Sequence, residues 1–367
     1  TRQNFYAWQS FYDLGYANSS MSGAAVTSLE NKDLKWEKNA NLNIGIEAKV
    51  FDRISATIEW YQRKTTDMLM SFPMATSLGF DGYNKNVGSM RNTGVDVTLG
   101  VDIFKDTPFT WNLTLIGSTI KNKVLQLADK PEIISGSYII REGETLYSFY
   151  TATSAGVDPA TGEQLYWAWD TDENGVKGEK YITNDMAKAT ACKEIQDSRI
   201  PDLYGSIGNT FKYKGFDFSF LLQGAGNRST YLTGGWYFQP FQADRSPKYM
   251  GNVMTMFLDR WTEDNPDNAK YPRMYFDDFG GSKNTRKNSY FLKDASYLRL
   301  KNLTIGYTIP VELTRKMLVE RIRIFFSGDN LATITNYPEL DPEREEDGRF
   351  VAYPQNKICS FGINVQF

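Results

Sequence analysis

The chain has 367 residues and a formal net charge of −3, from 41 Lys and Arg against 44 Asp and Glu. It contains no histidine and two cysteines, Cys192 and Cys359. The balanced charge excludes a strongly basic surface for nucleic acid, and the missing histidine excludes a Ser–His–Asp triad and a His-ligated zinc site. The distant cysteines form neither a CxxC motif nor a disulfide framework. We therefore expect no enzyme and no cofactor.

Alternation of apolar and polar residues with a period of two predicts nine β-strands. The first covers 38–50, where Leu42, Ile44 and Ile46 alternate with polar residues. The other eight are predicted at 54–67, 95–104, 109–121, 203–211, 216–226, 296–309, 321–331 and 357–367. In 296–309 the alternation slips by one position near Lys301 and Asn302, which indicates a β-bulge.

The connections between these strands alternate in length. Three are tight turns and one is modest, whereas the others are long, at about 68–86, 122–200, 227–293 and 333–356. Short turns at one end and long loops at the other are typical of an outer-membrane β-barrel, and strands of about ten residues match a tilted membrane span. The residues flanking the short turns are aromatic, as at a membrane interface: Phe51, Phe104, Phe109, Phe211, Tyr213 and Phe216.

The predicted fold class is therefore all-β, a transmembrane antiparallel β-barrel in the cell outer membrane with long extracellular loops. A complete single-chain bacterial barrel has an even number of strands, and nine open strands would leave two unpaired edges in lipid. We therefore expect residues 1–367 to be the C-terminal part of a larger barrel. The alternative is a secreted, glycan-binding β-sandwich, although sandwich strands are usually shorter.

Short motifs follow one another along the chain, and together they resemble the SusC/RagA type of TonB-dependent transporters of gut and oral bacteroidetes. The motifs are Asp33–Lys38, Val87–Gly88 with Asn92–Val95, Ala155–Gly162, Leu258–Thr262, Asp294–Asn302 through Gly306–Tyr307, Gly328–Leu331 with Leu340–Glu343, and the ending Tyr353–Phe367.

The resemblance implies a plugged barrel of roughly 22 strands that imports oligosaccharides or peptides with a SusD-like surface lipoprotein as its lid. It also implies that the plug and the TonB-contacting segment precede the barrel, outside this chain. We expect TonB-dependent import of oligosaccharides, with peptides as the alternative cargo and no nucleic acid as a partner.

Aromatic side chains in the two longest loops are the candidate contacts for substrate or for the lid. They are Trp167, Trp169, Trp236, Tyr237 and Phe238. Aromatic rings can stack on sugars or pack on a protein partner, but long loops also need aromatic cores of their own. Both interpretations stay open from the sequence.

Asp170, Asp172 and Asn174 occupy positions 1, 3 and 5 of a stretch that resembles the start of a calcium loop, with Gly175 at position 6. Position 12 is Tyr181 instead of the bidentate Glu, so an acidic hairpin tip is the preferred interpretation and calcium is a weak candidate. We expect no other metal.

Three further sets are interpreted from the pattern. Phe367 ends the last strand on its apolar face, and the resemblance implies a barrel-assembly signal there. The acidic cluster is expected to be a solvated loop, without catalysis: Asp341, Glu343, Glu345, Glu346 and Asp347. The polar faces of the strands are expected to line the lumen, and their members include Asn41, Asn43, Glu47, Glu59, Asp96, Thr98, Asp217 and Gln223.

Overall fold

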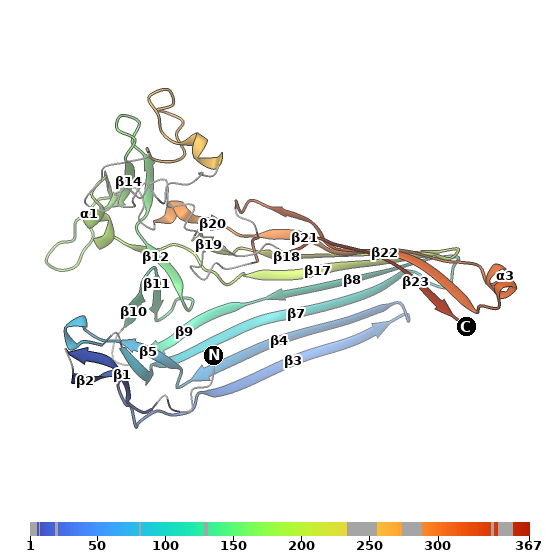
Figure 1. Ribbon diagram of the computed structural model, residues 1–367, viewed down its shortest axis with the longest axis horizontal. Coiled ribbons are helices and arrows are strands. Elements are labelled where there is room, and N and C mark those ends of the chain that lie inside the picture. Colours follow the sequence, from blue (N-terminus) through green and yellow to red (C-terminus); the bar gives the residue numbers. More distant parts are fainter. Residues whose placement is uncertain are drawn as a thin grey trace. The chain divides into compact units, whose positions relative to one another are not determined.

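Nine long antiparallel strands form the main sheet of the chain. The computed structural model describes residues 6, 8–18, 21–80, 82–127, 131–232, 255–273, 288–338, 341–343 and 355–367. The strands follow the order β23-β22-β21-β18-β17-β8-β7-β4-β3 (Figure 1). Their bounds are β3 Lys38–Val50, β4 Ile54–Thr66, β7 Gly88–Phe104, β8 Phe109–Thr119, β17 Leu203–Tyr213, β18 Phe216–Gly226, β21 Tyr297–Thr308, β22 Arg321–Thr335 and β23 Ile358–Gln366.

This sheet confirms the predicted strands. The largest differences are at the loop-side ends. β7 starts at Gly88, seven residues before the predicted start, and its first residues pair with β9 (Lys121–Leu127), with Gly88 opposite Leu127. Residues 88–94 are mostly polar and do not alternate, because a strand that extends beyond the lipid has no need of an apolar face.

The two faces of the sheet have opposite character, as the alternation requires. Apolar side chains that protrude from one face are strongly exposed in this chain, among them Ile44, Ile46, Phe361 and Ile363. We call this the outward face, and it is the face that contacts lipid in an outer-membrane barrel. The opposite, lumenal face carries the polar partners of the alternation.

Two of the short connections are tight hairpin turns with left-handed backbone. Phe51 and Asp52 have φ of 53° and 52° between β3 and β4, and Lys214 and Gly215 have φ of 43° and 88° between β17 and β18. Two consecutive residues with positive φ form the type I′ turn, whose twist matches that of antiparallel strands. The turn end of the sheet is therefore built from local hairpins.

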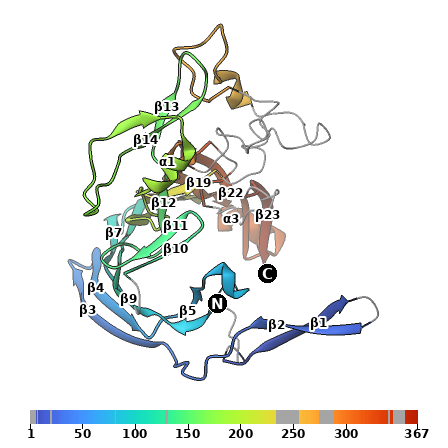
Figure 2. The ribbon, with the colours of Figure 1, turned by 90° about the vertical axis from the view of Figure 1, so that its left-hand side faces the viewer.

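The long loops contain regular structure of their own. The remaining elements are β1 Phe11–Asn18, β2 Met21–Ser28, β5 Leu69–Pro73, η1 Thr76–Leu78, β6 Gly82–Asn86, β10 Glu132–Ser135, β11 Tyr138–Arg141, β12 Ser148–Thr151, β13 Ser154–Val157, β14 Gln164–Ala168, β15 Tyr181–Thr183, α1 Met186–Ala191, β16 Glu194–Ile195, β19 Ser229–Tyr231, η4 Thr255–Asp259, η5 Ser289–Phe291, β20 Leu292–Asp294, α3 Val311–Thr314 and η6 Arg315–Met317. β1 and β2 pair as a two-stranded ribbon (Figure 2). No helix among the described residues is long and apolar enough to cross a membrane.

The chain divides into two compact units. The first comprises Thr1–Ile46, Ile58–Asp96 and Thr119–Ser148, and the second comprises Glu47–Thr57, Val97–Ser118 and Phe149–Phe367. The first unit has a buried apolar cluster that includes Phe72, Val87 and Val124. The second unit contains the candidate sites described below, and its buried apolar clusters lie in the loops.

Candidate functional site

The loop that carries Trp167 and Trp169 folds into a three-stranded sheet, β13-β14-β15, followed by α1. Trp169 is 6% exposed and packs with Ala168 and Cys192. Its backbone nitrogen donates to Cys192 Sγ at 3.3 Å, and the Cys192 thiol donates to the Trp169 carbonyl at 3.0 Å. Lys177 Nζ lies 4.1 Å from the centre of the Trp169 ring. Trp169 is therefore a core residue of this loop.

Trp167 has a different environment from Trp169. It is half-buried on β14, where it pairs with Ile182 of β15, an exposed residue. Of the two tryptophans, only Trp167 keeps part of its ring accessible. The other three aromatic candidates, Trp236, Tyr237 and Phe238, lie outside the described residues.

The acidic stretch after β14 forms a hairpin tip. Asp172 Oδ1 accepts hydrogen bonds from the backbone nitrogens of Asn174 and Val176 at 2.9 and 2.8 Å, so its carboxylate fixes the turn. The Tyr181 hydroxyl donates to Asp170 Oδ1 at 3.0 Å, and this bond raises the pKa of Tyr181. In the described part of the chain, no group of three or more His, Cys, Asp or Glu side chains could hold a metal ion.

Two of the motifs from the sequence come together in the second unit. Asp158 forms a tight turn, accepting from the Thr161 hydroxyl at 2.6 Å and from the Ala160 nitrogen at 2.9 Å, and these bonds lower the pKa of Asp158. Trp261, a hundred residues later in the chain, donates from Nε1 to the Pro159 carbonyl at 2.8 Å. Each motif therefore supplies one of the two partners in a single contact between distant parts of the chain.

Gly162 makes this contact possible. Its φ of +71° favours glycine, and a Cβ at this position would lie 2.6 Å from Trp261 Cδ2. The Arg273 backbone nitrogen donates to the Gly162 carbonyl at 2.8 Å. The 258–273 segment is thus held against the turn by ring packing, by the hydrogen bond of the Trp261 indole and by one backbone hydrogen bond.

A buried ion cluster on the lumenal face is the main feature that the sequence interpretation missed. Arg299 of β21 is 3% exposed, and its Nη2 lies 2.8 Å from Asp341 Oδ1, which is equally buried. Its Nη1 pairs with Glu343 and donates to Gln355 Oε1 at 2.6 Å. Its Nε donates to Thr333 of β22 at 3.0 Å. All three guanidinium nitrogens are therefore occupied.

This cluster corrects the expectation of a solvated acidic loop at Asp341 and Glu343. The two carboxylates precede residues 344–354, Gln355 follows them, and all three converge on Arg299. The two ends of this loop are thus fastened at one point of the lumenal wall. Three members of the acidic cluster lie outside the described residues: Glu345, Glu346 and Asp347.

A second lumenal ion pair crosses three strands near the turn end. Arg323 of β22 reaches over Gly306 of β21 to Asp217 of β18, with Nε 2.9 Å from Oδ1. A Cβ at Gly306 would lie 2.4 Å from Arg323 Nη2 and 2.6 Å from Asp217 Oδ1. The glycine therefore makes room for the pair. Asp217 was predicted to line the lumen, and its ion pair with Arg323 lies on that face.

Aromatic side chains form a continuous band near the turns of the second unit. The rings are 5.5–6.4 Å apart between centres, and the members are Phe104, Phe109, Trp111, Phe211, Phe218 and Phe220. Phe216 and Tyr307 pair at 4.4 Å. Such a band is expected where a barrel wall passes through the lipid headgroups. Phe367 follows β23 and is 89% exposed.

Comparison with known proteins shows that the chain is similar to TonB-dependent receptors. Residues 4–166 match the model of a TonB dependent receptor-like β-barrel. The TonB-dependent receptor P26 of Formosa agariphila is 29% identical over 96% of this chain, and the TonB-dependent receptor SusC of Bacteroides thetaiotaomicron is 25% identical over 99%. A solved structure of the RagAB peptide transporter matches with a TM-score of 0.80 and 26% identity over 98% of the chain.

The matches also show how much of such a protein this chain represents. It covers 37% of the P26 receptor, 35% of SusC and 39% of the matching chain in the RagAB structure. The chain thus spans less than two fifths of the length of the relatives that it matches.

Proposed function

We propose that this chain, a β-barrel segment of a TonB-dependent receptor of the SusC/RagA type, forms wall and outer loops of an active importer in the outer membrane. The cargo in this proposal is an oligosaccharide, the energy comes through TonB by way of the rest of the protein, and a SusD-like lipoprotein acts as the lid. The observation that carries the importer is the match of 98% of the chain to the RagAB transporter, at a TM-score of 0.80. The choice of an oligosaccharide as cargo rests on an aromatic loop side chain that stays partly accessible, Trp167.

Two features of the wall support transport. The lumenal face is polar and carries ion pairs such as Arg323 with Asp217, so a polar solute meets hydrogen-bonding groups. In their described residues, the loops on the opposite side from the hairpin turns contain strands and short helices, and Arg299 fastens the ends of one of these loops to the wall. The proposal includes no cofactor, and it assigns Phe367 as the assembly signal of the barrel.

Trp167 is the loop side chain that we assign to sugar contact, because its ring is partly accessible while that of Trp169 is buried. In the longer protein purified with its lipoprotein, we expect Trp167→Ala to weaken oligosaccharide binding about tenfold, the order of one lost ring contact. Isothermal titration against a panel of oligosaccharides and mixed peptides measures this. Phe361→Ala, at an exposed ring on the outward face, is the matched control and should bind normally.

Peptide import is the second candidate, and the similarity to the RagAB peptide transporter favours it. The same titration separates the two. Peptide binding without any oligosaccharide binding would replace the sugar proposal while leaving the importer intact. Oligosaccharide binding that is equal in the wild type and in Trp167→Ala would remove Trp167 from the site.

A further inference from the structure

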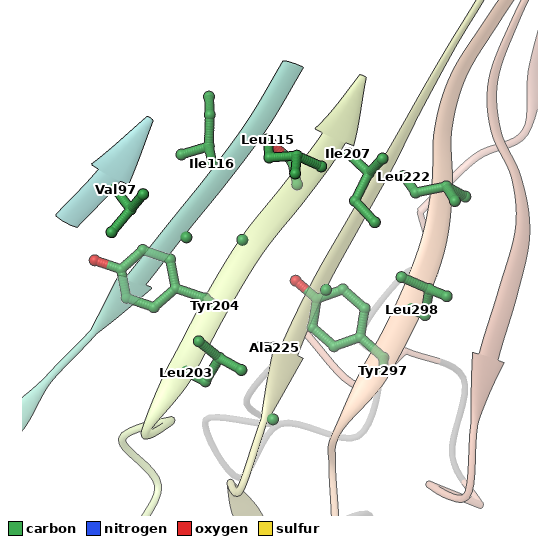
Figure 3. A pocket seen from close by; sticks show the side chains of 15 residues that line it. Val97, Leu115, Ile116, Leu203, Tyr204, Ile207, Leu222, Ala225, Tyr297 and Leu298 are labelled. Carbon is green, nitrogen blue, oxygen red and sulfur yellow. The ribbon is translucent and has the colours of Figure 1, made fainter. Parts of the chain in front are cut away.

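The outward face of the second unit contains an apolar hollow of about 470 Å³. It lies across β7, β8, β17, β18 and β21, and Figure 3 shows Leu115, Ile207 and Leu222 on one side of it and Leu203 and Leu298 on the other. Its volume lies within the range of about 300–1,000 Å³ that small-molecule sites occupy. A barrel wall in contact with lipid has no need of such a depression.

Missing side chains create the hollow. Gly117, Gly205 and Gly224 sit on the outward face of three adjacent strands, with Gly205 opposite Gly224 in the register and a Gly205 Cβ position 3.2 Å from Gly117 Cα. Gly226 lies opposite Leu203 in the same hollow. These four glycines leave a gap in the outward wall of leucine and isoleucine side chains. The gap runs across the strands, and we call it the lane.

The backbone explains two of these glycines but leaves the others unexplained. A Cβ at Gly205 would lie 2.4 Å from the Ile116 carbonyl oxygen, and one at Gly224 would lie 2.6 Å from that of Tyr297. At Gly117 and Gly226 a Cβ would meet no atom within 4 Å. Chain packing therefore permits larger residues at these two positions, where glycine leaves the lane open.

The depth of the hollow indicates which leaflet it faces. Gly205 precedes Tyr213, the last residue of β17 at the turn end, by eight residues. At a rise of about 3.3 Å per residue and a tilt of about 45°, this places the lane about 19 Å from the turns, in an apolar band about 25 Å tall. The lane therefore lies in the loop-side half of the membrane, which is the outer leaflet because the long loops are extracellular.

We propose that this hollow holds one acyl chain of a lipid A-type glycolipid from the outer leaflet. The hollow opens on the face that contacts the membrane, its lining is almost wholly hydrocarbon, and the leaflet at its depth is the glycolipid leaflet. A chain lying in the lane fills the space that the glycines leave and completes the apolar wall. This lipid site is separate from the cargo path on the lumenal face.

The test uses the longer protein, purified from outer membranes and reconstituted in nanodiscs of lipid A and phosphatidylethanolamine. Native mass spectrometry after release counts the lipids that stay bound. We expect the wild type to retain one lipid A, and Gly117→Phe and Gly226→Phe each to retain it about tenfold less. Ile363→Phe adds bulk at an exposed outward position on β23 and should retain lipid A as the wild type does.

Gly117→Phe and Gly226→Phe fill the lane independently, so the test needs only one of them to fold. Heat-modifiable migration in cold detergent gels shows which of these two filling variants is folded. Lipid A retained equally by the wild type and by the folded filling variants would overturn the proposal. Phosphatidylethanolamine retained in place of lipid A would overturn the assignment of the occupant, and equal loss in Ile363→Phe would show general boundary lipid and no site.

Discussion

At the scale of single residues, Asn209 shows how a polar group is accommodated on the lipid-facing side. The alternation of β17 places Asn209 between Ile207 and Phe211 on the outward face, where an unsatisfied amide would cost several kcal/mol. The Trp111 Nε1–H donates to Asn209 Oδ1 at 2.9 Å, and the amide is 8% exposed beneath the aromatic band. The sequence could not predict this pair, since its members are 98 residues apart.

A substitution at Gly162 tests the contact between the Asp158 turn and Trp261. Gly162→Ala introduces a Cβ at a φ of +71° and 2.6 Å from the Trp261 ring, so the 258–273 segment has to separate from the turn. We expect hydrogen exchange in 258–273 to increase by at least tenfold, for a local loss of about 1.4 kcal/mol or more.

Gly175→Ala is the matched control for this prediction. Gly175 has a similar φ of +81°, but a Cβ there meets nothing within 4 Å. It therefore carries the backbone strain without the collision, and exchange in 258–273 should stay as in the wild type. Equal exchange in both variants would show that Trp261 does not depend on the space at Gly162.

At the scale of elements, two β-bulges lie side by side and explain two of the motifs. β21 has one residue more than β18 at this level, since Leu221 and Leu222 pair with Asn302 and Leu300. β22 has one residue more than β21, since Asn302 pairs with Asp329 and Leu300 with Ala332. Asn330, within the second bulge, has a φ of 53°.

The sequence predicted the first bulge and missed the second. Alternation slips visibly at Lys301 because leucines stand on both sides of the slip, and the register confirms the bulge. In β22 the bulge follows Gly328, so no large side chain there shows which residues belong to the apolar face. The predicted strand also ended at Leu331, although β22 continues to Thr335. The alternation therefore reveals a bulge only where large apolar residues before and after it show that the apolar face has changed position.

Deleting Lys301 tests the role of the first bulge. Without the extra residue, Leu300 and Asn302 become neighbours that still pair with Leu222 and Leu221, so Arg299 stays opposite Gln223 on the lumenal face. The arginine therefore keeps its carboxylate partners, whose loss would cost about 3–5 kcal/mol. We expect the deletion variant of the longer protein to give a heat-modifiable barrel in outer membranes, as the wild type does.

Lys301→Ser keeps the residue count and is the control for this deletion. It should assemble as the wild type does, because the bulge needs the extra backbone unit and no lysine side chain. A deletion variant that gives no heat-modifiable barrel, while Lys301→Ser gives one, would show that the extra residue itself is needed at this level of the wall.

At the scale of the whole molecule, the nine-strand sheet and its outer-membrane character follow from the sequence, but the site does not. Strand pattern, turn positions and faces are set by local residue order, so alternation predicts them. The lumenal cluster joins Arg299 to residues more than forty positions away, and the hollow needs glycines on three strands to align. Such convergence depends on the register between strands, which the sequence alone leaves open.

The open sheet also predicts how this segment behaves on its own. In the described sheet, β3 and β23 each have a single neighbour, so one backbone edge of each long strand is unpaired. Every unpaired backbone group in hydrocarbon costs several kcal/mol, so a nine-strand sheet with two free edges is not a stable bilayer structure. In the importer proposed above, further strands would pair with both edges. Expressed alone and refolded into detergent or lipid vesicles, residues 1–367 should give aggregated material without heat-modifiable migration, whereas the longer protein refolded in parallel should show it. A monodisperse, protease-resistant species of the segment in vesicles would contradict this and would require that β3 and β23 pair with each other or with a second copy.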